Sequence, residues 1–288
     1  MKKNSQRTVI MKNKIKIYCF TCLILTFILT LLRCISLTAF YDTRTGYFNS
    51  AFIPTVMNMI YILSSVWCLS TLILIPHSHI ETDFTPSFMW MKGASMFSTV
   101  LFICSAIFML VSPTESKFHF INVLTVALSA LFFILTIVKN DKSDNIRAFI
   151  SMALIAALTV ILATLYFDMT IAMNSPHKIH GSFVLMSAMI FGLCETRTYL
   201  GTPIPRVHLA SALLTFMLGI SFTLSAIIYL FTAQPTEFVS NPVILGNVGY
   251  IGVIMGISVY AISRCFAFES KEITQTEKTE ESNGLYSL

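Results

Sequence analysis

The feature that most constrains this chain is a series of eight long apolar stretches separated by short polar segments. A helix needs about 20 apolar residues to cross a hydrocarbon core about 30 Å thick. Backbone polar groups inside a bilayer need internal partners, which only helices or a closed barrel provide. The stretches lack the alternation of barrel strands. They therefore predict eight membrane-spanning helices: Ile17–Phe40, Thr55–Ile75, Met91–Val111, Phe120–Val138, Ala148–Phe167, Gly181–Leu200, Leu209–Phe231 and Val243–Cys265.

Composition supports this fold class, an all-α integral membrane protein. Hydrophobic residues make up 55% of the 288 residues and charged residues only 11%. Soluble domains carry about 25% charged residues, so this chain has too few charges to cover a water-facing surface. A soluble enzyme, a secreted domain, a disordered chain and a nucleic-acid-binding protein are all excluded. The first partner that the sequence predicts is the lipid bilayer itself.

The positions of lysine and arginine predict the orientation, because cytoplasmic loops carry an excess of both. Residues 1–16 contain six such residues and no acidic residue, which keeps the N-terminus in the cytoplasm. With eight spans, the predicted outer loops receive only Arg44, Lys117 and Lys178. We therefore expect a multi-pass protein of the cell (inner) membrane with both termini cytoplasmic. The basic arm 1–16 is expected to contact anionic lipid headgroups, and the polar tail 266–288 to be disordered.

Short matches at a nearly constant spacing indicate an internal duplication. Residues 38–42 and 164–168 share the pattern Thr-x-aromatic-aromatic-Asp, and Cys68 and Cys194 keep the same offset. The sequence thus predicts two parallel four-helix repeats, residues 17–138 and 148–265, joined by a cytoplasmic linker at 139–147. Repeats of this kind are related by an axis along the membrane normal, and their interface is the first place to expect a site.

Charges within the predicted spans mark candidate sites, because ionisable groups inside a bilayer are costly. The sixth span must continue through Glu195 and Arg197 to cross the membrane. Residues two apart point to different faces of a helix, so these two need other partners, and Lys92 or Arg206 are candidates for the carboxylate. The alternatives to a functional role are a structural ion pair and a side chain that reaches the headgroups.

A second polar group is predicted near the outer ends of the first and fifth spans. Arg33 lies there, together with Asp42, Asp168, Thr38 and Thr164 at matching depths. His177 and His180 are expected in the adjoining loop. These residues are candidates for a solute or ion path. The alternatives are a salt bridge that locks the two halves together and an Arg33 side chain that reaches the lipid phosphates.

Histidine spacing gives only weak metal-site candidates, and no cofactor is predicted. His77, His79, Glu81 and Asp83 occupy every second position of an inner loop, and His177 and His180 lie in an outer one. Neither group supplies a good tetrahedral ligand set without a second element. The sequence also lacks the phosphate-binding, hydrolase and zinc-protease motifs.

Four glycines follow one face of the last span: Gly246, Gly249, Gly252 and Gly256. Small residues at such spacing let two helices approach closely. The stripe predicts tight helix packing, either inside the bundle or at a seam with a second copy or another membrane protein.

Three functional hypotheses follow. The first is a permease-like transporter of a small solute, with a path between the two repeats. The second is a non-catalytic scaffold or accessory subunit that assembles through its last span. The third is a membrane enzyme for lipid-linked substrates, with Asp42, Asp168 or the loop histidines as acid/base groups.

Overall fold

The computed structural model describes residues 2–42, 47–49, 52–75, 80–82, 89–111, 119–138, 144–167, 175–233 and 242–270. Among these residues, eight helical spans are long and apolar enough to cross a membrane, which confirms the prediction of a multi-pass membrane protein. The second span is divided at Ser70. The helices are α1 (Lys2–Phe40), α2 (Phe52–Leu69), α3 (Thr71–Leu74), α4 (Met89–Val111), α5 (His119–Ile137), α6 (Asp144–Phe167), α7 (Pro176–Tyr199), α8 (Pro205–Ala233) and α9 (Pro242–Ala267).

Proline sets where the last three helices begin. Pro176, Pro205 and Pro242 each occupy the first helical position, where the missing N–H costs no hydrogen bond. The Ser175 side chain caps α7 by accepting a hydrogen bond from the Lys178 N–H at 3.3 Å. Helices α7 and α8 therefore start several residues earlier than hydropathy predicts. This places three histidines in helices, His177 and His180 in α7 and His208 in α8.

Two short antiparallel strand pairs complete the described fold. Strands β1 (Tyr41–Asp42) and β2 (Tyr47–Phe48) follow α1, with Tyr41 opposite Phe48. Strand β3 (Ile80–Thr82) pairs with β4 (Phe268–Ser270) after α9. Strand β4 lies within the tail predicted to be disordered from residue 266, and it pairs with the segment after α3. Residues 271–288 lie outside the described part of the chain.

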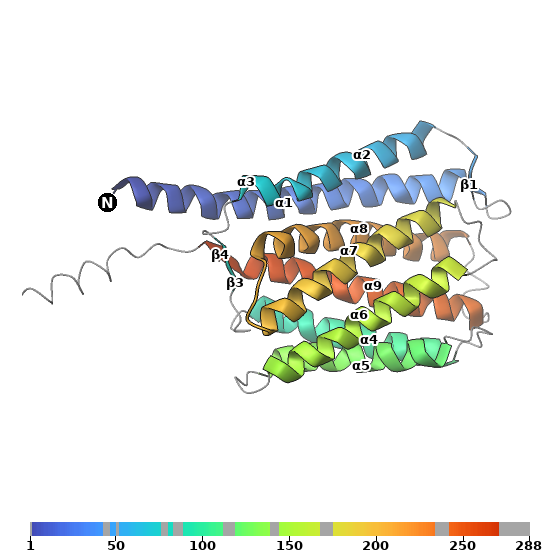
Figure 1. Ribbon diagram of the computed structural model, residues 1–288. Helices are drawn as coiled ribbons and strands as arrows, with labels where there is room; N and C mark the ends of the chain where they lie inside the picture. The colour runs from blue at the N-terminus through green and yellow to red at the C-terminus, as the bar shows by residue number, and fades with distance from the viewer. Residues whose placement is uncertain are drawn as a thin grey trace, which may run out of the picture.

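Helices α8 and α9 form the interior of the bundle. In each of these two helices, 61% of the most apolar 18-residue window is buried inside the protein, compared with 28% in the second span. Helices α4 to α9 pack on one another in chain order, and α9 returns to α4 to close the circuit. Helix α1 packs on α8, and α2 packs on α1. Helices α1 and α2 therefore lie on the opposite side of the bundle from α4 and α5 (Figure 1). The first four spans are therefore split into two pairs, and the internal duplication stays a prediction.

The glycine stripe of α9 faces α4 within the same chain. A Cβ added at Gly249 would lie 2.8 Å from Met109 Cγ and 3.0 Å from the Ser105 carbonyl oxygen. One at Gly252 would lie 2.3 Å from Ser105 Oγ. At Gly256 the nearest atoms belong to Phe102 at 3.1 Å. The missing side chains let the two helices touch, whereas the surroundings of Gly246 lie outside the described side chains.

Candidate functional site

A buried ion cluster joins the ends of three helices. Glu195 lies near the end of α7, His208 in the first turns of α8 and Arg264 near the end of α9. Glu195 Oε1 is 2.8 Å from His208 Nε2 and 3.0 Å from Arg264 Nε. The carboxylate and the imidazole are fully buried, and the guanidinium is 2% exposed. Because carboxylate oxygens only accept hydrogen bonds, His208 Nε2 carries the donated proton.

Hydroxyl groups and rings enclose this cluster. The Tyr260 hydroxyl donates to Glu195 Oε2 at 3.5 Å, and Thr198 Oγ1 lies 3.4 Å from His208 Nδ1. The ring of Phe191 packs beside both His208 and Tyr260, at 5.4 and 6.0 Å between ring centres. The cluster is therefore buried and tightly packed, and the charge of Arg264 balances that of Glu195.

The prediction that Glu195 needs partners outside α7 is consistent with this arrangement, but the partners differ from those expected. Lys92 is exposed, and Arg206 Nη1 donates to the Leu72 carbonyl. Arg197 is also exposed and donates to the Thr202 carbonyl at 3.2 Å. Sequence reasoning missed His208 and Arg264, because both lie at predicted span ends. The signal for His208 was Pro205, which starts α8 three residues before it.

A second polar group surrounds Arg33, which lies about two helical turns before the C-terminal end of α1. The Arg33 side chain is 2% exposed and lies close enough to the Tyr61 hydroxyl to interact with it electrostatically. Tyr61 donates to Ser221 Oγ at 2.8 Å, which links α2 and α8. The Arg33 guanidinium carbon lies 5.0 Å from the centre of the Phe222 ring. Within the described residues, Arg33 has no carboxylate partner and its Nε has no hydrogen-bond partner.

The other residues predicted beside Arg33 are described only in part. Asp42 belongs to β1, and Asp168 lies outside the described residues. Thr38 donates to the Cys34 carbonyl and Thr164 to the Val160 carbonyl, each within its own helix. Among the described residues, Arg33 lies beside a tyrosine and a phenylalanine, and its grouping with the two aspartates stays a prediction.

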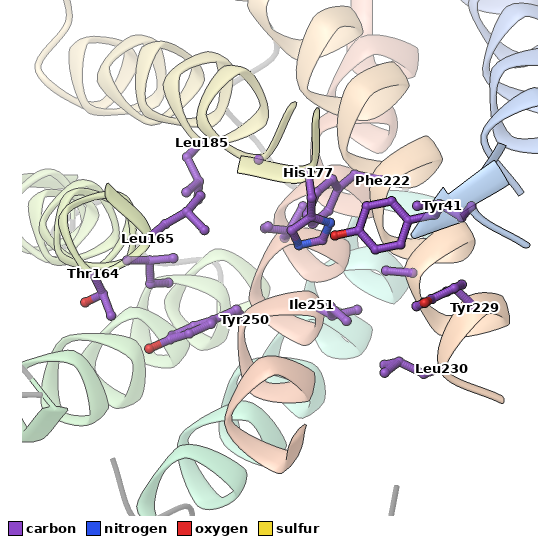
Figure 2. Close-up of a pocket in the computed structure, with 15 residues that line it drawn as sticks. Tyr41, Thr164, Leu165, His177, Leu185, Phe222, Tyr229, Leu230, Tyr250 and Ile251 are labelled. Atoms are coloured by element: carbon purple, nitrogen blue, oxygen red, sulfur yellow. The ribbon is translucent and has the colours of Figure 1, made fainter. Parts of the chain in front are cut away.

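A pocket of about 260 Å³ opens at this end of the bundle, which we name the Tyr41 end. Residues of α1, β1, α6, α7, α8 and α9 line it, and the imidazole of His177 and the hydroxyl of Tyr41 project toward the same part of it (Figure 2). Burial raises the pKa of Tyr41, so its hydroxyl stays protonated and can donate. The lining residues are Leu37, Tyr41, Ile161, Thr164, Leu165, His177, Gly181, Leu185, Phe222, Ala226, Tyr229, Leu230, Tyr250, Ile251 and Ile254.

His177 and His180 occupy successive turns of α7. His177 lines the pocket, with its ring 5.0 Å from that of Phe222. His180 lies one turn further in, and its ring meets the Tyr61 ring edge-on at 4.0 Å. No group of three or more metal-binding side chains occurs among the residues that the structure describes. His77 and His79 lie outside those residues.

Hydroxyl groups fill the interior between the Tyr41 end and the ion cluster. Ser211, Thr223 and Ser225 of α8 each donate to a carbonyl of their own helix. Ser258 of α9 donates to the Thr215 carbonyl at 3.1 Å, and Thr215 donates to Ser187 of α7 at 3.5 Å. These contacts join α7, α8 and α9 and close the interior below the pocket.

Comparisons with known proteins give no relative from which a role could be transferred. No family model matches the chain. No curated protein and no solved structure matches it either.

Proposed function

We propose that this chain is a permease-like transporter that binds a small amphipathic solute in the pocket at the Tyr41 end. The observation that carries the proposal is the contrast between the two ends of α8. At one end its residues line a partly open pocket, and at the other His208 belongs to a closed ion cluster. Ionisable groups within a membrane often mark the route of a solute or an ion.

The predicted orientation gives this contrast a direction. With cytoplasmic termini, the Tyr41 end faces outward and the Glu195–His208–Arg264 cluster lies at the cytoplasmic side. The pocket is then open to the outer side, and the cluster closes the inner side. Release inward requires α7, α8 and α9 to separate near Glu195, which would break an ion pair that reforms afterwards.

The proposed binding site does not lie between the two predicted four-helix repeats. Helices α6 to α9 supply most of the pocket lining, and α1 adds Leu37. The solute would therefore bind where α1 meets the second half of the chain. The scaffold hypothesis gains no support from the described glycines of α9, because α4 of the same chain already covers them.

Orientation can be tested with reporter fusions. Alkaline phosphatase joined after Thr232, at the Tyr41 end of α8, is expected to be active because that enzyme folds only outside the cytoplasm. Green fluorescent protein joined after Leu288 is expected to be fluorescent. The opposite pair of results would place the pocket on the cytoplasmic side.

Transport can be tested by filling the pocket. Purified protein in liposomes on a solid-supported membrane is expected to give a saturable current with at least one charged aromatic solute from a panel of carboxylates, sulfonates, amines and amino acids. Thr164→Phe, which puts a ring into the pocket, should reduce that current at least about tenfold, because the solute loses its site.

Thr159→Phe is the matched control. Thr159 lies on the same helix, is exposed and donates to its own i−4 carbonyl just as Thr164 does, at 2.8 Å in both cases. The control should keep the wild-type current. Wild-type currents no larger than those of empty liposomes across the panel, or equal losses in both variants, would contradict the proposal.

A further inference from the structure

The buried charge of Arg33 next to the pocket indicates which solutes the pocket selects. Arg33 and Leu37 are four residues apart on α1, so they share a helix face about 6 Å apart along the axis. Leu37 lines the pocket. On α7, His180 lies three residues after His177 and directly before Gly181, and both of these line the pocket. Arg33 and His180 are thus close neighbours of the residues that line the pocket.

Phe222 connects Arg33 and His180 to the pocket. Its ring lines the pocket, and the centre of the same ring lies 5.0 Å from the Arg33 guanidinium carbon and 6.5 Å from the centre of the stacked His180 ring. The side chains of Arg33 and His180 are only 2% and 9% exposed. Each also keeps a ring or guanidinium nitrogen, Arg33 Nε and His180 Nε2, without a hydrogen-bond partner among the described residues.

A buried arginine without a counter-charge is expensive. Buried charges are normally paired, and removing one partner of a buried pair strongly destabilises a protein. The nearby Tyr61 hydroxyl dipole and the face of Phe222 stabilise the guanidinium, the latter through a cation–π contact, but neither carries a negative charge. No described carboxylate lines the pocket. The positive potential of Arg33 therefore extends into the pocket.

The aromatic and aliphatic residues that line the pocket suit the apolar part of a solute. Four aromatic side chains, Tyr41, Phe222, Tyr229 and Tyr250, line the pocket together with leucine and isoleucine residues. The tyrosine hydroxyls and His177 can donate hydrogen bonds. At about 260 Å³ the pocket is smaller than the 300–1,000 Å³ typical of sites for drug-sized ligands.

We infer that the pocket selects small organic anions, with an aromatic or branched apolar body held among the tyrosines and a single carboxylate or sulfonate group directed toward Tyr41, His177 and the buried Arg33. The inference rests on the proposed function for the use of this pocket. It assigns Arg33 as the residue that determines charge preference. The bound anion supplies the negative charge that the described residues around Arg33 lack.

Three probes of matched shape test the charge preference: benzenesulfonate, benzyl alcohol and benzyltrimethylammonium. None of them changes charge near neutral pH. Binding is measured by calorimetry with the protein in nanodiscs of zwitterionic lipid, and empty nanodiscs give the blank. Benzenesulfonate is expected to bind at least about tenfold more tightly than the other two, because hydrogen bonds to charged groups are the strong ones.

Arg33→Gln should remove this preference. The variant is expected to lose at least about tenfold in benzenesulfonate affinity and to keep its affinity for benzyl alcohol, whereas Arg33→Lys should retain part of the preference. Arg33→Gln should also unfold at the same temperature as the wild type or higher, because it removes a buried charge that lacks a counter-ion. Arg197→Gln, at an exposed arginine, is the control and should change neither measurement.

Several results would overturn the inference. Tighter binding of the cation, equal binding of all three probes, or an undiminished preference in Arg33→Gln would each do so. A marked loss of stability in Arg33→Gln would identify Arg33 as a structural residue. If benzenesulfonate binds as expected but no anion of the panel gives a current, the ligand class stands and the transport proposal fails. If only cationic solutes give currents, transport stands and the ligand class fails.

Discussion

Replacing Arg264 with methionine should lower the free energy of unfolding by about 3–5 kcal/mol, the usual cost of breaking a buried ion pair. The variant leaves the Glu195 carboxylate fully buried, with His208 and Tyr260 as its remaining partners. Neither partner is permanently charged. The measurement is the midpoint of thermal unfolding of purified protein in detergent, followed by the loss of its monodisperse peak in size-exclusion chromatography.

A double variant separates the ion pair from simple loss of packing. Glu195→Gln with Arg264→Met removes both charges and keeps side chains of similar length, so it should recover most of the stability lost in Arg264→Met. Arg197→Met is the control at an exposed arginine and should leave the midpoint unchanged. A double variant no more stable than Arg264→Met would show that the charges are not what holds the three helix ends together.

Arg33 and Arg264 provide an internal comparison. Both side chains are 2% exposed, and each belongs to a span. Only Arg264 lies beside a carboxylate, at 3.0 Å from Glu195. We therefore expect opposite effects on stability when each is made neutral, because only one replacement leaves a buried charge behind. The comparison uses the same measurement for two residues of the same type and burial.

The spans could be predicted from sequence because one physical requirement governs them. A chain must place about 20 apolar residues in the hydrocarbon core, and hydropathy counts these directly. The helix starts were less accurate, since Pro176 and Pro205 begin α7 and α8 outside the most apolar segments. Their proline signal was present in the sequence but lies among polar residues that hydropathy excludes.

The candidate sites could be predicted only in part. Depth along a helix follows from sequence, so Glu195 and Arg33 were identified as costly residues. Which helices become neighbours does not follow, because any apolar face packs acceptably against lipid or another helix. The structure therefore places His208 and Arg264 beside Glu195, where Lys92 or Arg206 had been expected. Tyr61 and Phe222 contact Arg33 for the same reason, since α2 and α8 had no predicted place beside α1.

The second large loss of stability is expected from a substitution that disrupts the packing of α9 on α4. Gly249→Leu should lower the free energy of unfolding by about 3 kcal/mol, at the upper end of the usual cost of overpacking. Its Cβ alone would lie 2.8 Å from Met109 Cγ and 3.0 Å from the Ser105 carbonyl oxygen, and a backbone atom cannot rotate away. The measurement is again the midpoint of thermal unfolding.

Gly93→Leu in α4 is the matched control, because a Cβ at Gly93 would meet no atom within 4 Å. It should leave the midpoint unchanged or raise it slightly, since leucine favours helices more than glycine does. Mass photometry of both variants adds a second readout. If the described glycines served a seam between two copies, Gly249→Leu would dissociate a complex and leave the monomer as stable as before. Loss of stability without a change in mass would instead show that the stripe acts within one chain, where it brings α9, and with it Arg264, to its place beside α7 and α8.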